Sequence, residues 1–238
     1  MIKFFRHIRK RLIGENRFTK YLIYAIGEIV LVVIGILIAL QINNWNQLKK
    51  EQAFEKEILQ QIRANLLKDK ITLKEIKGNF EKAMSSTEKI LTATWTSGEK
   101  DSVQYWLGNI IQFDRFHPLT NAYEVAKSKG LDLITNKQLR FKIGAYYDDE
   151  LIDVGKSIED IENAFHRDWL DIIRNETIEI KFKEHVILKD LSFLKGNTKA
   201  QNILKLNRGN YSGGHRRLIK VLKSIDNLLS LIKKEIEN

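Results

Sequence analysis

The chain of 238 residues contains no cysteine, a single proline and only 13 glycines. The missing cysteines exclude disulfides, thiolate metal sites and a thiol nucleophile. They do not identify the compartment, because an oxidising space also accepts a cysteine-free domain. The shortage of proline and glycine disfavours a turn-rich β-sandwich. Together with the many Leu, Ile, Lys, Glu and Asn residues, these absences favour an all-α fold built from long helices.

Sequence motifs for catalysis are also absent. The patterns GxSxG, GxxxxGK, GxGxxG and HExxH do not occur, and the five histidines are scattered. His166, Asp168 and Asp171 form a polar cluster, but a long helix that exposes charges opposite an apolar seam produces such clusters without any function. We therefore expect a protein that is not an enzyme, with no catalytic residue, no metal and no cofactor. An enzyme whose site assembles from scattered residues is the open alternative.

The net charge of +10 is concentrated at the N-terminus. Residues 1–20 carry a charge of +6, which leaves +4 for the remaining 218 residues. A nucleic-acid-binding face would be a basic stripe on the folded body, whereas this excess lies beside an apolar segment and suits anionic lipid. We expect no nucleic-acid partner. Apolar residues at helical spacing within residues 1–20 predict a basic amphipathic segment, with a frayed tail as the alternative.

One apolar run, residues 21–42, is long enough to cross a membrane. A helix of 22 residues rises about 33 Å, and a hydrocarbon core is about 30 Å thick. Tyr21 and Tyr24 lie at one end of the run and Trp45 follows the other end, as expected at lipid–water boundaries. A buried helix of a soluble domain would have to hide an almost wholly apolar circumference. A cleaved signal peptide would have a shorter apolar region, of about 7 to 15 residues. We therefore predict a transmembrane helix at 21–42.

The distribution of basic residues predicts the orientation of this span. Seven Lys and Arg residues precede it and three follow it within residues 41–60. The positive-inside rule then places the N-terminus in the cytoplasm. We expect a single-pass protein of the inner membrane whose residues 43–238 form one periplasmic helical domain.

Glu28 interrupts the apolar run. An ionised carboxylate about 10 Å inside the bilayer is costly, so it needs a reason. On a helix Glu28 shares a face with Gly35 and Ala39, a small-xxx-small pair where a second helix can approach closely. Glu28, Gly35 and Ala39 are thus a candidate intramembrane interface, with either a second copy sharing a protonated carboxyl or a partner subunit bearing a cation. The alternative is a lone protonated or snorkelling carboxyl that faces lipid.

Three apolar seams at heptad spacing predict an antiparallel bundle of long helices beyond the span. The first helix should reach about Thr94, the second should end near Asn175, and the third should begin just after "SGG". Residues 177–188 alternate apolar and polar side chains like a strand, but no second run of equal strength offers a partner, so we expect an extended connection or a short edge strand. The seams are Leu59, Ile62, Leu66, Asp69, Leu73, Ile76, Phe80, Ala83, Thr87 and Ile90; Tyr147, Leu151, Val154, Ile158, Ile161, Phe165 and Ile172; and Leu218, Leu222, Ile225, Leu229, Ile232 and Ile236.

Several residues are expected to cap or end these helices, and one cluster is expected to bind an anion. Asp101 should cap a short helix through Phe113, and capping boxes are predicted at Asn121 with Glu124 and at Thr135 with Gln138. Gly130 fits a left-handed helix end. In "YSGGHRR" two glycines leading into a helix would expose backbone N–H groups beside basic side chains. This candidate anion site comprises Gly213, Gly214, His215, Arg216 and Arg217, and a flexible helix entry is the alternative.

The segments "FTKYLIYAIGEIVLVVIGILIALQINNWN" and "TNAYEVAKSKGLDLITNKQLRFKIGAYYDD" resemble the N-terminus and central block of a family of uncharacterised single-pass membrane proteins from Bacteroidota. This family is a domain of unknown function. The resemblance implies the topology and the helical body, but it supplies no activity. Lys129 stands where the family usually has a small residue.

These features favour a membrane-anchored, non-enzymatic helical module that acts through protein contacts, as a scaffold, tether or accessory subunit. Its expected partners are the lipid bilayer and either a second copy or another membrane protein. The alternative is an extracytoplasmic ligand-sensing bundle that acts through a membrane partner, because helical bundles next to membrane helices also form chemoreceptor domains.

Overall fold

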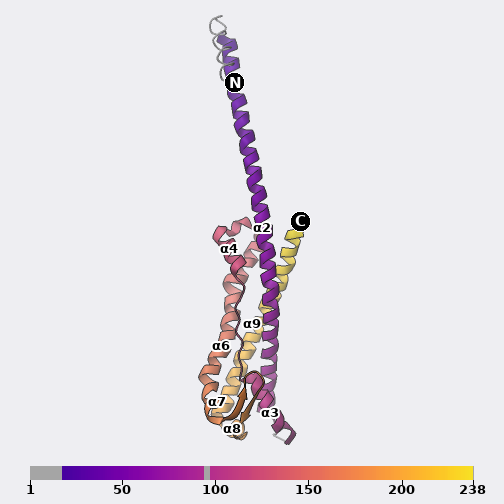
Figure 1. Ribbon diagram of the computed structural model, residues 1–238, viewed down its shortest axis with the longest axis vertical. Coiled ribbons are helices and arrows are strands. Elements are labelled where there is room, and N and C mark those ends of the chain that lie inside the picture. Colours follow the sequence, from indigo (N-terminus) through magenta and orange to yellow (C-terminus); the bar gives the residue numbers. More distant parts are fainter. Residues whose placement is uncertain (1–17, 94–96, 238) are drawn as a thin grey trace. The chain divides into compact units, whose positions relative to one another are not determined.

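The computed structural model describes residues 18–93 and 97–237 and is predominantly helical, which confirms the all-α prediction (Figure 1). Residues 1–17 of the predicted basic segment lie outside the described residues. Two units are distinguished, one ending at Phe54 and the other beginning at Glu55. The elements are α2 (Phe18–Thr92), α3 (Ser97–Ile110), α4 (Asn121–Lys129), the 3₁₀ turn η1 (Leu131–Leu133), α5 (Lys137–Ala145), the π-helical segment η2 (Tyr146–Glu150), α6 (Leu151–Ala164), the π-helical segment η3 (Phe165–Trp169), α7 (Leu170–Glu176), β1 (Thr177–Lys181), β2 (His185–Leu188), α8 (Phe193–Gly196) and α9 (Thr198–Glu237).

The first unit contributes the N-terminal part of α2, and the second unit contains the hydrophobic core. All ten positions of the first predicted seam, from Leu59 to Ile90, are buried there. This agreement follows from geometry, because residues at alternating steps of three and four lie on one face of a helix. Helix α2 ends at Thr92, close to the predicted end at Thr94.

The second long helical segment is formed by α5, η2, α6, η3 and α7 in succession. It ends at Glu176, as the seam predicted, but its buried face shifts at η3. Phe165 is only partly buried, whereas Trp169 is 1% exposed. A π-helical turn holds more residues than an α-helical turn, so it rotates the following residues around the axis. This rotation explains why Trp169 replaces Asp168 on the buried side.

The third long helix, α9, begins at Thr198 and not after Gly214. The predicted start was therefore wrong, because "SGG" lies inside the helix. Gly214 is buried where a side chain would collide with Phe80, since a Cβ atom there would lie 2.6 Å from Phe80 Cε2 and 3.6 Å from Ser157 Cβ. The glycine permits close packing of α9 against α2 and α6, and it does not end a helix.

Pairs of contacts give the directions of the three long segments. Along α2, Lys70 and Glu88 contact Asp226 and Arg208 of α9, so these two helices are antiparallel. Asn136 and Glu150 likewise pair with Glu235 and Lys220 of α9. The second segment and α9 are thus also antiparallel, and Figure 1 shows α6 beside α9.

Helix α9 is antiparallel to both α2 and the second segment, so these two run in the same direction. The chain must therefore return along the bundle between the end of α2 and the start of the second segment. Residues 111–120, which we call the strap, make this return. Asp114 contacts Asn79, and the backbone N–H of Leu119 contacts Asp69. The two contact points on α2, Asp69 and Asn79, are ten residues apart, and ten helical residues rise about 15 Å. The two contact points on the strap are five residues apart, and five fully extended residues span about 16 Å. The strap is therefore almost fully extended alongside α2.

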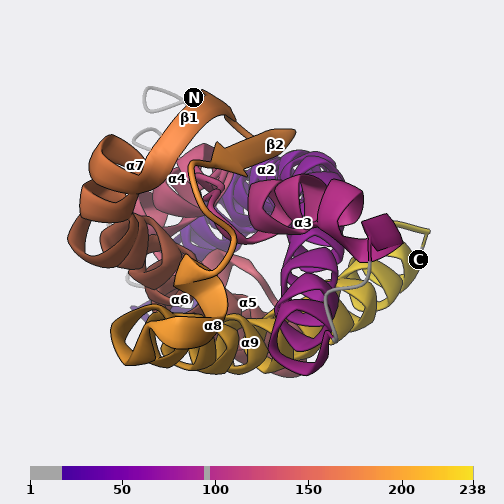
Figure 2. The same ribbon diagram turned by 90° about the horizontal axis from the view of Figure 1, so that it is seen from below.

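A two-stranded antiparallel hairpin follows the second segment (Figure 2). Residues 177–188 contain a short edge strand, β1, which was one of the two expected outcomes. The sequence did not reveal its partner, because β2 lies in the same segment and pairs with β1 directly after a short turn. Val186 and Leu188 of β2 are buried in a cluster with Leu107 of α3 and Trp169. A Cβ atom on Gly108 would lie 2.2 Å from the Glu184 carbonyl oxygen, so that glycine allows α3 to approach the turn.

Helix ends differ from the predicted capping pattern. Helix α3 begins at Ser97, so Asp101 lies inside it, and it ends at Ile110 before Phe113. Thr120 precedes α4 without a side-chain cap, which removes the predicted box at Asn121. The cap of α5 is Asn136, whose side chain accepts a hydrogen bond from Leu139 N at 3.0 Å. Gly130 has a positive φ of 100°, but its ψ of 117° lies outside the left-handed helical conformation that was predicted.

Candidate functional site

The apolar part of α2 in the first unit has no protein cover among the residues the structure describes. Its large apolar side chains from Leu22 to Ile42 are 46–67% exposed. Monomeric soluble proteins rarely expose an apolar surface of this size, because transfer of each large aliphatic side chain from water to an apolar environment gains about 1.5–3 kcal/mol. This helix is long and apolar enough to cross a membrane.

The candidate intramembrane residues lie on one face of this helix, as the sequence predicted from helical geometry. Glu28 is half-buried, and Gly35 and Ala39 are exposed. A Cβ atom added to Gly35 would meet no atom within 4 Å, so the backbone is accessible there. Two α-helices can approach closely where small residues recur at such spacing. Gly27 is equally open but lies about 100° away around the helix.

A buried carboxylate connects α2 to the strap in the second unit. Asp69 occupies a seam position and is 3% exposed, and its two carboxylate oxygens lie 3.3 Å and 3.2 Å from Leu119 N, which donates to them. Burial raises the pKa of Asp69 to about 6, although the hydrogen bond from Leu119 lowers it. The sequence marked Asp69 only as a polar break in the seam. Its partner lies 50 residues away along the chain.

The residues next to Asp69 include two tyrosines of the π-helical segment η2. Tyr146 and Tyr147 are 1% and 5% exposed, and their hydroxyl groups have no hydrogen-bond partner within the described residues. Burial raises the pKa of both tyrosines above the usual range, and the nearby charge of Asp69 adds to this effect. Tyr147 stacks on Tyr123, with ring centroids 4.4 Å apart. The Tyr123 hydroxyl donates to Asp148 at 2.6 Å, which ties α4 to η2.

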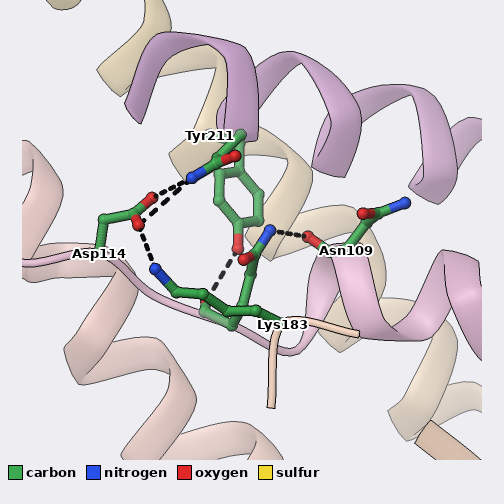
Figure 3. A network of polar contacts seen from close by, with 6 residues as sticks. Asn109, Asp114, Lys183 and Tyr211 are labelled. Carbon is green, nitrogen blue, oxygen red and sulfur yellow. Dashed lines mark hydrogen bonds and ion pairs between the residues drawn. The ribbon is translucent and has the colours of Figure 1, made fainter. Parts of the chain in front are cut away.

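Contacts of Asp114 and Tyr211 hold the other end of the strap (Figure 3). Asp114 accepts a hydrogen bond from Asn79 of α2 and pairs with Lys183 of the hairpin turn at 2.5 Å. The buried Tyr211 hydroxyl lies 3.0 Å and 3.1 Å from the carbonyl oxygens of Ile110 and Gln112. The strap is thus held by α2, by α9 and by the hairpin.

A hollow of about 370 Å³ lies between the strap and α6. Its charged lining includes Arg115, which forms a bidentate pair with Glu162 that lowers the pKa of this glutamate. Because Arg115 is already paired and acidic side chains predominate, the hollow does not present a free cationic site. The lining residues are Asp114, Arg115, Phe116, His117, Gly155, Ile158, Glu159 and Glu162.

The predicted anion site loses its structural basis. Gly213 and Gly214 lie in the interior of α9, where backbone N–H groups belong to the helical hydrogen-bond ladder. His215 Nε2 lies 2.9 Å from Glu81 Oε1, and Arg216 donates to Ser212 at 3.0 Å. The helix start that would have exposed the N–H groups was therefore misplaced, although Arg217 is exposed on the same surface.

Within the described residues, no group of three or more His, Asp and Glu side chains is arranged to hold a metal ion. His166 of the polar cluster considered from the sequence lies 3.7 Å from Glu162, whereas Asp168 pairs with Arg167 at 2.8 Å. His166 and Asp168 therefore interact with different side chains and not with each other.

Comparison with known proteins gives one family. The model of the Family of unknown function (DUF6090) matches residues 28–165, which is more than half of the chain. The match includes Glu28, the first seam, the strap and the π-helical segment η2. No curated protein and no solved structure matches the chain.

Proposed function

Because this chain belongs to the DUF6090 family, for which no activity is assigned, we propose its function from its geometry: it is a membrane-anchored helical module that acts through protein contacts. One observation carries this proposal. A single helix, α2, contains both an uncovered apolar stretch and a seam buried in a helical body. The uncovered apolar stretch requires lipid or a partner helix, and the buried seam belongs to a folded domain. A tether, scaffold or accessory subunit combines these two parts.

The proposed topology places the N-terminus in the cytoplasm of an inner-membrane protein and residues 43–238 in the periplasm. The excess of basic residues before the apolar stretch supports this orientation. Fusions of periplasm-active and cytoplasm-active reporters to the C-terminus test it. Alkaline phosphatase should be active there and green fluorescent protein dark. The reverse pattern would overturn the orientation.

The proposed interface inside the membrane uses Glu28, Gly35 and Ala39, and its occupant is a second copy or another membrane protein. Glu28→Leu should lower association in a membrane two-hybrid assay, because it removes the polar group from the shared face. Gly35→Leu should also lower association by blocking close approach. Gly27→Leu is the matched control, since Gly27 is equally open but lies off this face. Equal association for all three variants would reject the interface.

A ligand-sensing bundle is the second candidate, and the hollow beside the strap favours it. A ligand there would contact both the strap and α6, so binding should stabilise the fold. Thermal-shift screening of the full chain in detergent tests this function. The variant His117→Ala serves as control, because it alters the hollow without touching the Arg115–Glu162 pair. A compound that raises the midpoint equally in both proteins would not occupy this hollow.

A further inference from the structure

The outer edge of β1 is a site without a pairing partner among the described residues. The sheet has two strands, and β2 lies toward α3 whereas β1 lies toward α7 (Figure 2). Apart from the turn bond that Glu184 N donates to Lys181 O at 2.9 Å, no backbone hydrogen bond in the described part of the chain joins β1 to a segment other than β2. An open strand edge presents backbone N–H and C=O groups that can pair with another strand.

Apolar side chains of β1 and the adjoining turn are also incompletely covered. Ile180 is 37% exposed and Phe182 is 43% exposed, although Phe182 packs edge-on against Phe113 and Phe165. Ile178 is 70% exposed, at an irregularity in the pairing between Thr177 and Glu179. The core covers β2 but leaves the rim at β1 partly open, so an added strand would bury apolar surface there.

The charges of β1 indicate which strand fits. In "EIK", Glu179 and Lys181 flank Ile180, so the segment is complementary to a second antiparallel copy of itself. In the register centred on Ile180, each Glu179 lies opposite Lys181 of the other copy. A register centred on Glu179 would oppose two glutamates, and one centred on Lys181 would oppose two lysines, both of which are unfavourable. Glu179 and Lys181 contact His185 and Glu184 in their own chain, but their side chains remain 59% and 61% exposed.

We propose that two copies of this chain associate through β1, pairing antiparallel about Ile180 to form a continuous four-stranded sheet. This contact is isologous, because both copies use the same residues. Lysines on an edge strand ordinarily oppose such pairing. Here the register turns each Lys181 into the partner of a glutamate, and Lys183 is already neutralised by Asp114. The inference does not depend on the proposed intramembrane interface.

The absence of cysteine from the sequence makes a disulfide test direct. Directly opposed residues of antiparallel strands have Cα atoms about 4.5 or 5.5 Å apart, and both values lie within the disulfide range. In full-length Ile180→Cys protein purified in detergent, a mild oxidant should convert most of the 27.8 kDa chain to a dimer of twice that mass, and a reductant should reverse this.

Ile178→Cys is the matched control, because Ile178 is more exposed than Ile180 but does not meet its own counterpart in this register. The two copies of residue 178 would be four residues apart along the strands, about 13 Å. Its dimer yield should be at least tenfold lower. In the Ile180→Cys background, Glu179→Lys should reduce the yield several-fold, and adding Lys181→Glu should restore it.

Each outcome decides the proposal. A protein that stays monomeric with Ile180→Cys would overturn it, provided that circular dichroism shows the native helix content. Equal yields for the cysteines at 178 and 180 would overturn it too, because they would indicate random collision. Failure here leaves the membrane anchor untouched, whereas loss of membrane association would not remove a dimer formed in detergent.

Discussion

Gly214 gives the most direct prediction for the second unit, because Gly214 and Gly209 lie in the same helix, α9, but in different surroundings. A Cβ atom at Gly214 would lie 2.6 Å from Phe80 Cε2, and one at Gly209 would meet no atom within 4 Å. Phe80 cannot easily move away. Its side chain is 1% exposed, and its ring packs edge-on against Tyr211 with centroids 5.0 Å apart.

Two opposing effects determine the magnitude. Replacing an exposed helical glycine by alanine stabilises a protein by about 1 kcal/mol. Overpacking a well-filled core costs about 1–3 kcal/mol. Gly209→Ala should therefore raise the free energy of unfolding by about 1 kcal/mol. Gly214→Ala gains the same propensity but meets the collision, so it should be about 1–3 kcal/mol less stable than Gly209→Ala.

Thermal unfolding of the full chain in detergent, followed by circular dichroism, measures this difference. For a domain of this size 1 kcal/mol corresponds to about 2–4 °C, so Gly209→Ala should melt several degrees above Gly214→Ala. Gly214→Ala should cost less in a Phe80→Leu background than in the wild type, because leucine lacks the ring atom that collides. Equal stabilisation by both alanines would refute the packing of α9 on Phe80, and with it the position of "SGG" inside the helix.

Two further predictions concern the polar contacts of the second unit. Asp69→Asn should remove a pH dependence. Because burial raises the pKa of Asp69 from 3.8 to about 6, the folded state holds the proton more tightly than the unfolded chain does. Wild-type stability should therefore fall by about 2 kcal/mol relative to the variant as pH rises from 4 to 6. Unfolding curves at several pH values check this, and a constant difference would contradict the burial of the carboxylate. Asn136→Ala should cost about 1 kcal/mol through loss of the α5 cap, whereas Gln138→Ala should have no measurable effect in the same melts. The opposite order would restore the capping box predicted from the sequence.

The long-range part of the fold was predictable where a periodic pattern repeated often enough. The seam from Leu59 to Ile90 has ten positions, and all are buried. Short elements were not predictable in the same way. β2 has four residues, and its turn uses Lys183 at a φ of 66° in place of a glycine or asparagine, so the usual hairpin signal is missing.

Glycines were misread for a physical reason. In a sequence, two adjacent glycines indicate flexibility, but the structure uses Gly214 for close helix packing, which depends on Phe80 more than 130 residues earlier. The surroundings of Asp69 could be predicted only in part for a similar reason. Asp69 stood out as a carboxylate in an apolar seam, but nothing local indicated that the backbone of Leu119 would satisfy it, or that Tyr146 and Tyr147 would lie close to it.

The central proposal, a membrane anchor whose one face meets another protein, is tested most directly by photo-crosslinking from two leucines of the apolar stretch. Leu31 lies beside the Glu28 and Gly35 face, and Leu37 lies on the opposite side; they are 67% and 58% exposed. With a photoreactive residue at each position in intact membranes, the account predicts protein adducts from position 31 and lipid adducts from position 37. Lipid adducts alone at both positions would contradict the interface, and the absence of lipid adducts at position 37 would contradict the membrane anchor itself.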